Sequence, residues 1–494
     1  MRFEFPNAAP ASVGIPAAAI DRFLNRLTVN RLPMHSVLML RHGKLVFENY
    51  WKPFDENRKH RLYSTSKSFV SAAVGILIGD GKLSLDDPVG KFFPDKVTPE
   101  THPWVTGATI RDLLMMATPH LRNDRTTYSP EDPDWADTYF QTEPTHLPGK
   151  IFSYDTTATT MLCIIIARVT GMEFPDFLRE RLFIPAGMSE DIYCIETPCG
   201  HAWGGSGVMA TPRDLAKFAY CCMEGGRING QQLIPEDYIR AATSKQIDNT
   251  LTAETAEHTF GYGYQFWRTR HNGFACRGMG SQLAVCLPDQ DFILVTTADT
   301  QGIPSACETI YDALWQEIFP YLEKAEPAAE AAEDAALLDK WRGREILPVQ
   351  GEKSSPKAAE ISGKTFVFDT PNQPGLKWAR FTFAGDEGTL EYENADGAQR
   401  LCFGMGHQTA GRLTQTKYFG RRIGTPKGEG YECTASAGWM TENLLHIVCY
   451  SIDDHVGTLG MDFAFEDGCI TYMGRNYAEW FFGELWGFAG GREA

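Results

Sequence analysis

Tyr63-Ser64-Thr65-Ser66-Lys67-Ser68-Phe69 begins the stretch of sequence that decides the fold. The chain continues with an apolar run rich in Ala and Ser as far as Ile78, and Gly79-Asp80-Gly81 follows it. A run of this composition predicts a buried helix over Ser66 to Ile78, with a glycine cap at its C-terminal end. Ser64 is therefore expected just before the N-terminus of a long core helix.

Ser64 and Lys67 are three residues apart, so a helix would place the hydroxyl and the amine on one face. A lysine whose pKa is lowered by burial and by nearby cations can activate a serine as a nucleophile. The alternative is that Ser64 only caps a core helix, and the motif by itself leaves both interpretations open. The same spacing recurs in the polar segment Ser354-Ser355-Pro356-Lys357, and we assign no function to that copy.

A second polar segment precedes an apolar run that is predicted to be helical over 157–169. It reads Pro148-Gly149-Lys150-Ile151-Phe152-Ser153-Tyr154-Asp155-Thr156. A tyrosine at such a junction of loop and helix can act as a general base when a lysine cation lowers the pKa of its hydroxyl. Taken in isolation, Tyr154 fits better as a packed aromatic ring with a hydrogen-bonded hydroxyl.

The remaining pattern predicts a mixed fold followed by a β-rich part. Up to about residue 320, predicted helices (16–27 and 108–116) occur together with antiparallel strands (36–40, 45–50 and a pair within 283–297). This mixture predicts an α/β or α+β domain over residues 1–324. A linker rich in Ala, Glu, Lys, Ser and Pro is expected over 325–360, with one short helix near 335–341. Successive short strands then predict an all-β, lipocalin-like barrel domain over 361–494.

Charge and composition exclude several classes of function. The 494 residues carry a net charge of −17, which leaves no excess of Lys and Arg to neutralise nucleic-acid phosphates. Residues 1–7 lack the apolar core of a signal peptide, and no apolar run is long enough to cross a bilayer. We therefore expect a cytoplasmic protein with no membrane partner. The twelve Cys form no Cys-x-x-Cys pair and the His form no His-x-x-x-His pair, so neither a metal nor an organic cofactor is expected.

Several stretches, in the same order along the chain, together give a resemblance to a known family. They are Tyr63 to Phe69, Gly81-Lys82-Leu83, Asp86-Asp87-Pro88-Val89, Thr109 to Leu114, Pro148 to Tyr154, Thr170-Gly171, Pro185-Ala186-Gly187-Met188, Gly204-Gly205-Ser206-Gly207 and Thr211 to Ala216. Over about residues 10–315 the chain resembles the serine hydrolases related to class C β-lactamases and penicillin-binding proteins. The resemblance implies a helical lobe and an antiparallel sheet flanked by helices, with the site between them, and an acyl-enzyme mechanism.

The resemblance also implies roles for individual residues. Ser64 would be the nucleophile, with Lys67 and Tyr154 as its catalytic proton relay. The backbone N–H groups of Ser64 and Met279 would form the oxyanion hole. Contacts with substrate are implied for Thr156, Arg277, Gly278 and Gly280.

Three departures separate the chain from true β-lactamases. Thr156 stands where the family often has Asn, and Ala117-Thr118-Pro119 replaces the usual Thr-Ser-Gly. A Lys-Thr-Gly or His-x-Gly motif is not convincingly present, because Asn-Gly in His271-Asn272-Gly273 is first of all a hairpin-turn signal. Arg277-Gly278-Met279-Gly280-Ser281-Gln282, expected on the next strand, looks more like the 6-aminohexanoate-dimer hydrolases and family VIII carboxylesterases. Glycines there also fit a bulge or a close backbone approach.

These observations predict a serine hydrolase that acts on a small ester or amide. Two alternatives stay open: a catalytically weak or inactive penicillin-binding-like ligand-binding protein, and a true β-lactamase or D-aminopeptidase. The absence of a convincing Lys-Thr-Gly or His-x-Gly motif favours a protein that has lost turnover. The intact set of Ser64, Lys67 and Tyr154 favours an enzyme. A small molecule is the expected partner, and formation of a homo-oligomer is left open.

Overall fold

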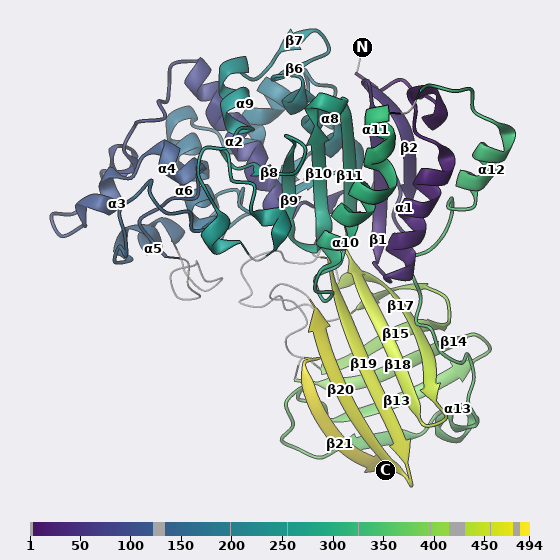
Figure 1. Ribbon diagram of the computed structural model, residues 1–494. Helices are drawn as coiled ribbons and strands as arrows, with labels where there is room; N and C mark the ends of the chain where they lie inside the picture. Colours follow the sequence, from purple (N-terminus) through teal and green to yellow (C-terminus); the bar gives the residue numbers. More distant parts are fainter. Residues whose placement is uncertain are drawn as a thin grey trace.

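The computed structural model describes residues 3–121, 134–197, 199–253, 255–324, 326–395, 397–413, 430–454, 456–477 and 485–494. The chain forms a larger mixed part that contains the N-terminus and a β-barrel that contains the C-terminus (Figure 1). The described helices are α1 (Ala17–Val29), α2 (Ser66–Gly79), α3 (Pro103–Gly107), α4 (Ile110–Leu114), α5 (Trp135–Gln141), α6 (Thr156–Thr170), α7 (Phe174–Leu178), α8 (Pro212–Met223), α9 (Glu236–Ala242), α10 (Ala306–Ala313), α11 (Phe319–Lys324), α12 (Ala332–Asp339) and α13 (Pro356–Ile361).

A six-stranded antiparallel sheet forms the centre of the larger part, in the order β2-β1-β11-β10-β9-β8. Its strands are β1 (Met34–Arg41), β2 (Lys44–Tyr50), β8 (Trp267–Arg268), β9 (Phe274–Gly278), β10 (Gln282–Leu287) and β11 (Phe292–Ala298). Every residue of β1, β10 and β11 is buried, because α8 covers one face and α1 and α10 cover the other. These strands are largely apolar, as expected of a sheet covered on both faces, although β1 also buries His35, Ser36 and Arg41.

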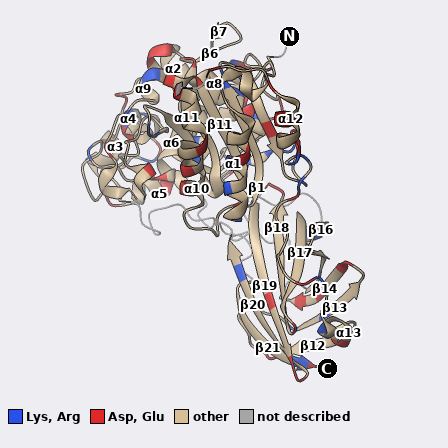
Figure 2. Ribbon diagram, turned by 45° about the vertical axis from the view of Figure 1, so that its right-hand side comes forward, with Lys and Arg blue, Asp and Glu red and all other residues tan. Residues whose placement is uncertain are grey.

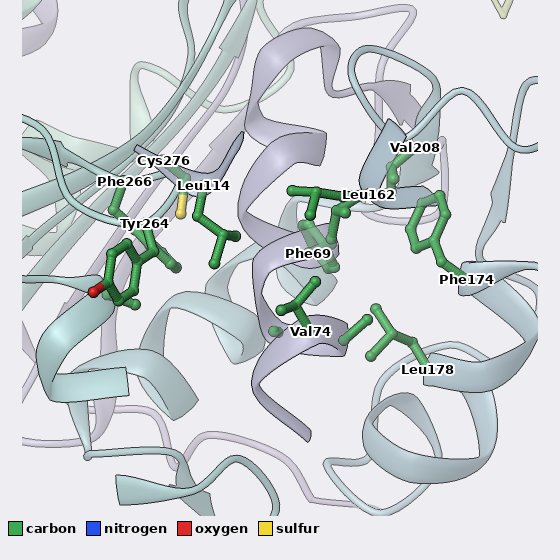
Figure 3. Packing of buried hydrophobic residues seen from close by; sticks show 14 of the residues in the cluster. Phe69, Val74, Leu114, Leu162, Phe174, Leu178, Val208, Tyr264, Phe266 and Cys276 are labelled. Carbon is green, nitrogen blue, oxygen red and sulfur yellow. The ribbon is translucent and has the colours of Figure 1, made fainter. Parts of the chain in front are cut away.

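The helical lobe is built around α2. Its residues from Ser66 to Leu77 are buried all round, as expected of a core helix rather than an amphipathic surface helix. Phe69 and Val74 of α2 lie among the apolar side chains of the neighbouring elements, including Leu162 of α6, Phe174 of α7 and Leu114 of α4 (Figure 3). The predicted helix over Ser66 to Ile78 is confirmed, whereas the helix predicted over 108–116 is shorter and is capped by Thr109.

Short strands complete this part of the molecule. They are β3 (His60–Arg61), β4 (Tyr193–Cys194), β5 (Val208–Ala210), β6 (Arg227–Ile228) and β7 (Gln231–Gln232). β3 pairs with β5, and the backbone N–H of Leu62 donates to the Val208 carbonyl at 2.8 Å. The chain therefore enters the Tyr63–Thr65 turn from an ordered strand.

The C-terminal part is a closed barrel of nine strands, which confirms the predicted β-rich architecture. The strands are β12 (Thr365–Phe368), β13 (Trp378–Ala384), β14 (Glu387–Asn394), β15 (Gly397–Met405), β17 (Tyr431–Thr441), β18 (Leu444–Ile452), β19 (Val456–Glu466), β20 (Cys469–Tyr477) and β21 (Gly487–Glu493), with β16 (Thr409–Leu413) added to β17. A short parallel pairing of β15 with β17 closes it. Inward side chains fill the described interior, where a cavity of about 10 Å³ lies among residues such as Leu390, Phe463 and Tyr472.

Residues 326–360 hold two helices and make contacts with both parts. Trp341 is fully buried and donates from Nε1 to Asp21 of α1 at 2.8 Å. Glu352 forms a β-bridge with Trp439 of the barrel. We propose domain boundaries at 324 and 361, with a connector between them that is anchored on both sides. Composition predicted neither α13 nor this anchoring.

Acidic and basic residues are interspersed over both parts of the molecule (Figure 2). Among the helices of the described residues, none combines the length and the apolar character needed to cross a membrane.

Candidate active site

Ser64 lies in a 3₁₀ turn, Tyr63–Thr65, immediately before α2. Lys67 follows in the first turn of α2 and is 1% exposed, whereas Ser64 is only half-buried. The Lys67 Nζ donates to Ser64 Oγ at 2.9 Å and to the Gly205 carbonyl at 2.5 Å. The predicted meeting of these two side chains on one helix face therefore occurs, and Gly205 holds the lysine from the opposite side.

The residue before Ser64 has an unusual backbone. Tyr63 has φ 47°, in the left-handed region that a bulky residue rarely adopts. Such a conformation costs free energy and persists only where the surroundings fix it. The Tyr63 ring is buried, and the Arg61 guanidinium lies over it at 4.3 Å from the ring centroid. This turn is thus held in one conformation by its neighbours.

Tyr154 approaches Lys67 from the loop before α6. Lys67 Nζ lies 5.1 Å from the centroid of the Tyr154 ring, and the ring stacks on Trp267 at 5.5 Å between centroids. Asp155 caps α6 by accepting from the Thr157 N–H at 2.8 Å, and it accepts from the Thr118 hydroxyl at 3.1 Å. Burial raises the pKa of the Asp155 carboxyl. The cap fixes where α6 begins, and with it the position of Tyr154.

Met279 lies in a tight turn that joins β9 to β10. Gly278 pairs with Gln282, and Met279–Ser281 form the turn between them, with φ 72° at Gly280 and 67° at Ser281. The sequence predicted one strand over these residues, and the left-handed pair instead reverses the chain. A Cβ on Gly278 would lie 2.2 Å from the Leu62 carbonyl oxygen, so any larger residue would force the two backbone segments apart. The close backbone approach anticipated for Gly278 is therefore found.

A cleft of about 690 Å³ opens over these groups. Its lining includes Ser64, Tyr154, Arg277, Gly278, Met279 and Gly280, which the sequence had singled out. Of the aromatic group at 262–267, Trp267 lines the cleft, whereas Tyr262 and Tyr264 are buried in the core. The structure therefore brings most of the predicted site residues to one cavity.

The far wall of the cleft is polar. Arg277 Nη2 lies 4.0 Å from Glu308 Oε1, and the buried Arg277 Nη1 has no hydrogen-bond partner among the described residues. Burial and, to a smaller extent, the nearby Arg277 cation lower the pKa of His258 to about 3, so its ring is neutral at neutral pH. Arg277 lines the cleft, and a guanidinium in that position suits an anionic or strongly accepting group of a ligand.

Two sequence interpretations are settled by local geometry. His271 and Asn272 have φ 55° and 54° and lie between the paired strands β8 and β9, so His271-Asn272-Gly273 is a hairpin turn. Lys357 of the second Ser-x-x-Lys copy pairs with Glu360 at 2.6 Å. Neither segment contributes to the cleft.

Thr156 lies at the first position of α6 with its methyl group against Gly205, and it is absent from the described lining of the cleft. Its predicted contact with substrate stays a prediction. Sequence reasoning missed His258, Gln301 and Glu308, which also line the cleft. They carry no motif, and Glu308 is placed only by the path of α10. In the described parts of the chain, no group of three or more His, Cys, Asp or Glu is arranged to hold a metal ion.

Comparisons with known proteins identify the family of the chain. The beta-lactamase family model matches residues 20–314. A 6-aminohexanoate-dimer hydrolase of Paenarthrobacter ureafaciens is 24% identical over 292 residues, covering 55% of this chain and 74% of the relative. A candidate 6-aminohexanoate-dimer hydrolase from Bacillus anthracis shares the fold, with a TM-score of 0.56, 20% identity, and coverage of 66% of this chain and 89% of that one. The family match spans more than half of the 494 residues, so the chain belongs to the beta-lactamase family and is a serine hydrolase of the superfamily that includes penicillin-binding proteins.

Proposed function

We propose that the protein hydrolyses small esters or amides through an acyl-enzyme on Ser64. The observation that carries this proposal is the 2.9 Å contact of Lys67 Nζ with Ser64 Oγ at the wall of a 690 Å³ cleft. A serine becomes a nucleophile when an adjacent base takes its proton. Water stabilises the charged form of an amine, and an amine that is nearly buried loses this stabilisation. Lys67 lies beside the Ser64 hydroxyl and is 1% exposed.

In the first step, the Ser64 Oγ–H proton passes to the relay of Tyr154 and Lys67 while Oγ bonds to the carbonyl carbon. The carbonyl oxygen becomes an oxyanion, and the N–H groups of Ser64 and Met279 stabilise it. The relay then protonates the departing alcohol or amine, which leaves the acyl group on Ser64. Water attacks this ester, its proton goes to the relay, and collapse returns the proton to Ser64 Oγ and releases the acid.

The proposal is tested by Ser64→Ala, with Ser305→Ala on the same cleft wall as the matched control. Turnover of p-nitrophenyl esters and labelling by a fluorophosphonate probe are measured together. Ser64→Ala should lose both, because removing a covalent nucleophile typically lowers the rate by several orders of magnitude. Retention of more than about a hundredth of the wild-type rate by Ser64→Ala would contradict the assignment.

Arg277 favours a second candidate, hydrolysis of a β-lactam or a D-aminoacyl amide that bears a carboxylate. A guanidinium that lines the cleft can hold such a group. Side-by-side assays of short-chain p-nitrophenyl esters, nitrocefin and D-aminoacyl p-nitroanilides separate the two. We expect the esters to have the highest kcat/KM, and equal kcat/KM for nitrocefin would favour the second candidate.

The packing of the described barrel interior weighs against binding of a ligand inside the barrel. Only about 10 Å³ remains among Leu390, Phe463 and their neighbours, too little for any organic ligand.

A further inference from the structure

The start of β19 in the barrel contacts the larger part directly beside the Ser64 turn. The Val456 carbonyl accepts a hydrogen bond from the Tyr63 hydroxyl at 2.9 Å and another from Gln301 Nε2 at 3.1 Å. Thr458 Oγ1 donates to Asp299 Oδ2 at 2.7 Å, and Gln301 Nε2 also donates to Asp299 Oδ1 at 2.9 Å. These contacts form one polar network, defined here as Tyr63, Asp299, Gln301, Val456 and Thr458.

Three members of the network are buried, and the other two, Gln301 and Thr458, are half-buried. Tyr63 is 1% exposed, Asp299 3% and Val456 2%. In such surroundings each hydrogen bond is electrostatically stronger than at the surface, and a lost partner leaves a polar group unsatisfied. The network therefore fixes the groups that it joins more firmly than surface contacts would.

One arm of the network leads to Ser64. Tyr63 is its immediate neighbour and is held at φ 47°, which only a constraining environment maintains. The hydroxyl bond to Val456 anchors the far end of this side chain, so a barrel backbone atom helps to hold the strained turn.

The other arm leads to Met279. Thr300, between Asp299 and Gln301, donates from its backbone N–H to the Gly280 carbonyl at 3.4 Å, and its hydroxyl lies 2.8 Å from Ser281 Oγ. The barrel holds Asp299 and Gln301, which are the residues on either side of Thr300. The segment 299–301 thus connects β19 with the turn that carries Met279.

We propose that Val456 and Thr458 are positioning residues that hold both backbone donors of the oxyanion hole in place from the barrel. The inference rests on the proposed function, since it assumes that the N–H groups of Ser64 and Met279 receive the oxyanion. The described residues that line the cleft lie between 64 and 308, so the described part of the barrel acts from behind the site.

A network that only holds the two parts together would give a different result from one that positions the oxyanion donors. If the network only docks the barrel, its loss lowers stability and leaves the chemistry unchanged. If it positions the donors, its loss lowers kcat while KM stays constant, because the oxyanion exists only in the transition state. The split between kcat and KM therefore separates the two roles.

The test uses the full chain. Thr458→Val removes the hydroxyl at nearly constant shape, Thr458→Ser keeps it, and Tyr63→Phe removes the bond to Val456. Thr471→Val makes the same change on β20 toward the opposite end of the barrel, where Thr471 is exposed. Activity on p-nitrophenyl acetate, the fluorophosphonate labelling rate and Tm are measured for each variant.

We expect Thr458→Val and Tyr63→Phe to lower kcat about tenfold or more with KM within about twofold, since small displacements of catalytic groups have effects of this size. Thr458→Ser and Thr471→Val should match the wild type. If both test variants keep kcat within about twofold of wild type while Ser64→Ala is inactive, the inference is wrong and the proposed function stands. Activity in Ser64→Ala would instead refute the proposed function and the inference with it. Should Tyr63→Phe fail to fold, Thr458→Val and Asp299→Asn decide the matter.

Discussion

Gly278→Ala tests whether the approach of β9 to the Ser64 turn sets the rate of reaction. An added Cβ would lie 2.2 Å from the Leu62 carbonyl oxygen, whereas Cβ atoms in proteins essentially never approach closer than 3.0 Å. The obstacle is backbone, which cannot rotate away as the end of a side chain can. The end of β9 and Leu62 must therefore separate by about 0.8 Å, the difference between these two distances.

This displacement acts on both sides of the oxyanion hole. Leu62 precedes Tyr63-Ser64, and Met279 follows Gly278 directly. Donors stabilise an oxyanion only when they lie about 2.7–3.1 Å from it, so a shift of this size weakens or removes one of the two hydrogen bonds. We expect kcat on p-nitrophenyl acetate to fall roughly 100-fold, which is the typical effect of losing one such donor or of a misplacement near 1 Å.

The assay compares Gly278→Ala with Gly490→Ala, because a Cβ at Gly490 of the barrel meets nothing within 4 Å. Circular dichroism and Tm establish that both variants are folded. Gly490→Ala should match the wild type in kcat. A folded Gly278→Ala variant with kcat within about threefold of wild type would refute the reasoning.

Two further predictions concern the relay and the buried carboxyl behind the site. Lys67→Ala and Tyr154→Phe should each lower kcat strongly. The double variant should be little worse than either, because the effects of groups that act as a unit are not additive. If the fold-losses in kcat instead multiply in the double variant, the two side chains act independently. Burial raises the pKa of Asp299 to about 6 from an ordinary 3.8, so the folded protein holds this proton more tightly than the unfolded chain does. The contribution of Asp299 to stability is then largest below about pH 4 and falls by about 3 kcal/mol as pH rises through 6. Tyr450, a titratable group that faces Asp299, stays neutral because burial raises its pKa. The Tm of Asp299→Asn minus the Tm of wild type should therefore increase from pH 4 to pH 7. A difference that is constant over this range would contradict the raised pKa of Asp299.

Local chemistry predicted the parts of the site that depend on near neighbours in the sequence. Ser64 and Lys67 meet because a helix places i and i+3 on one face. Asn272-Gly273 marks a hairpin, in which His271 and Asn272 take positive φ, and both of these residue types are enriched in that conformation. In both places the sequence holds all the information that the geometry needs.

Long-range contacts account for what could not be predicted. Gly205 accepts from Lys67 across 138 residues, and the Tyr63 hydroxyl reaches Val456 across 393. Neither Val456 nor Thr458 differs from any other strand residue in sequence. The turn at 279–281 was expected as strand, because a serine in the left-handed region leaves no sequence signal. Only the assembled fold shows these contacts.

Mapping the covalent intermediate tests the central claim most directly. The protein is mixed with a slowly hydrolysed p-nitrophenyl ester, quenched in acid within the burst phase, and analysed by intact mass and by peptide mapping. We predict one acyl group per chain, on the peptide that contains Ser64, and none on the Ser64→Ala variant under the same conditions. An acyl group on any other residue, or product release from wild type with no acylated protein at any time, would contradict the account.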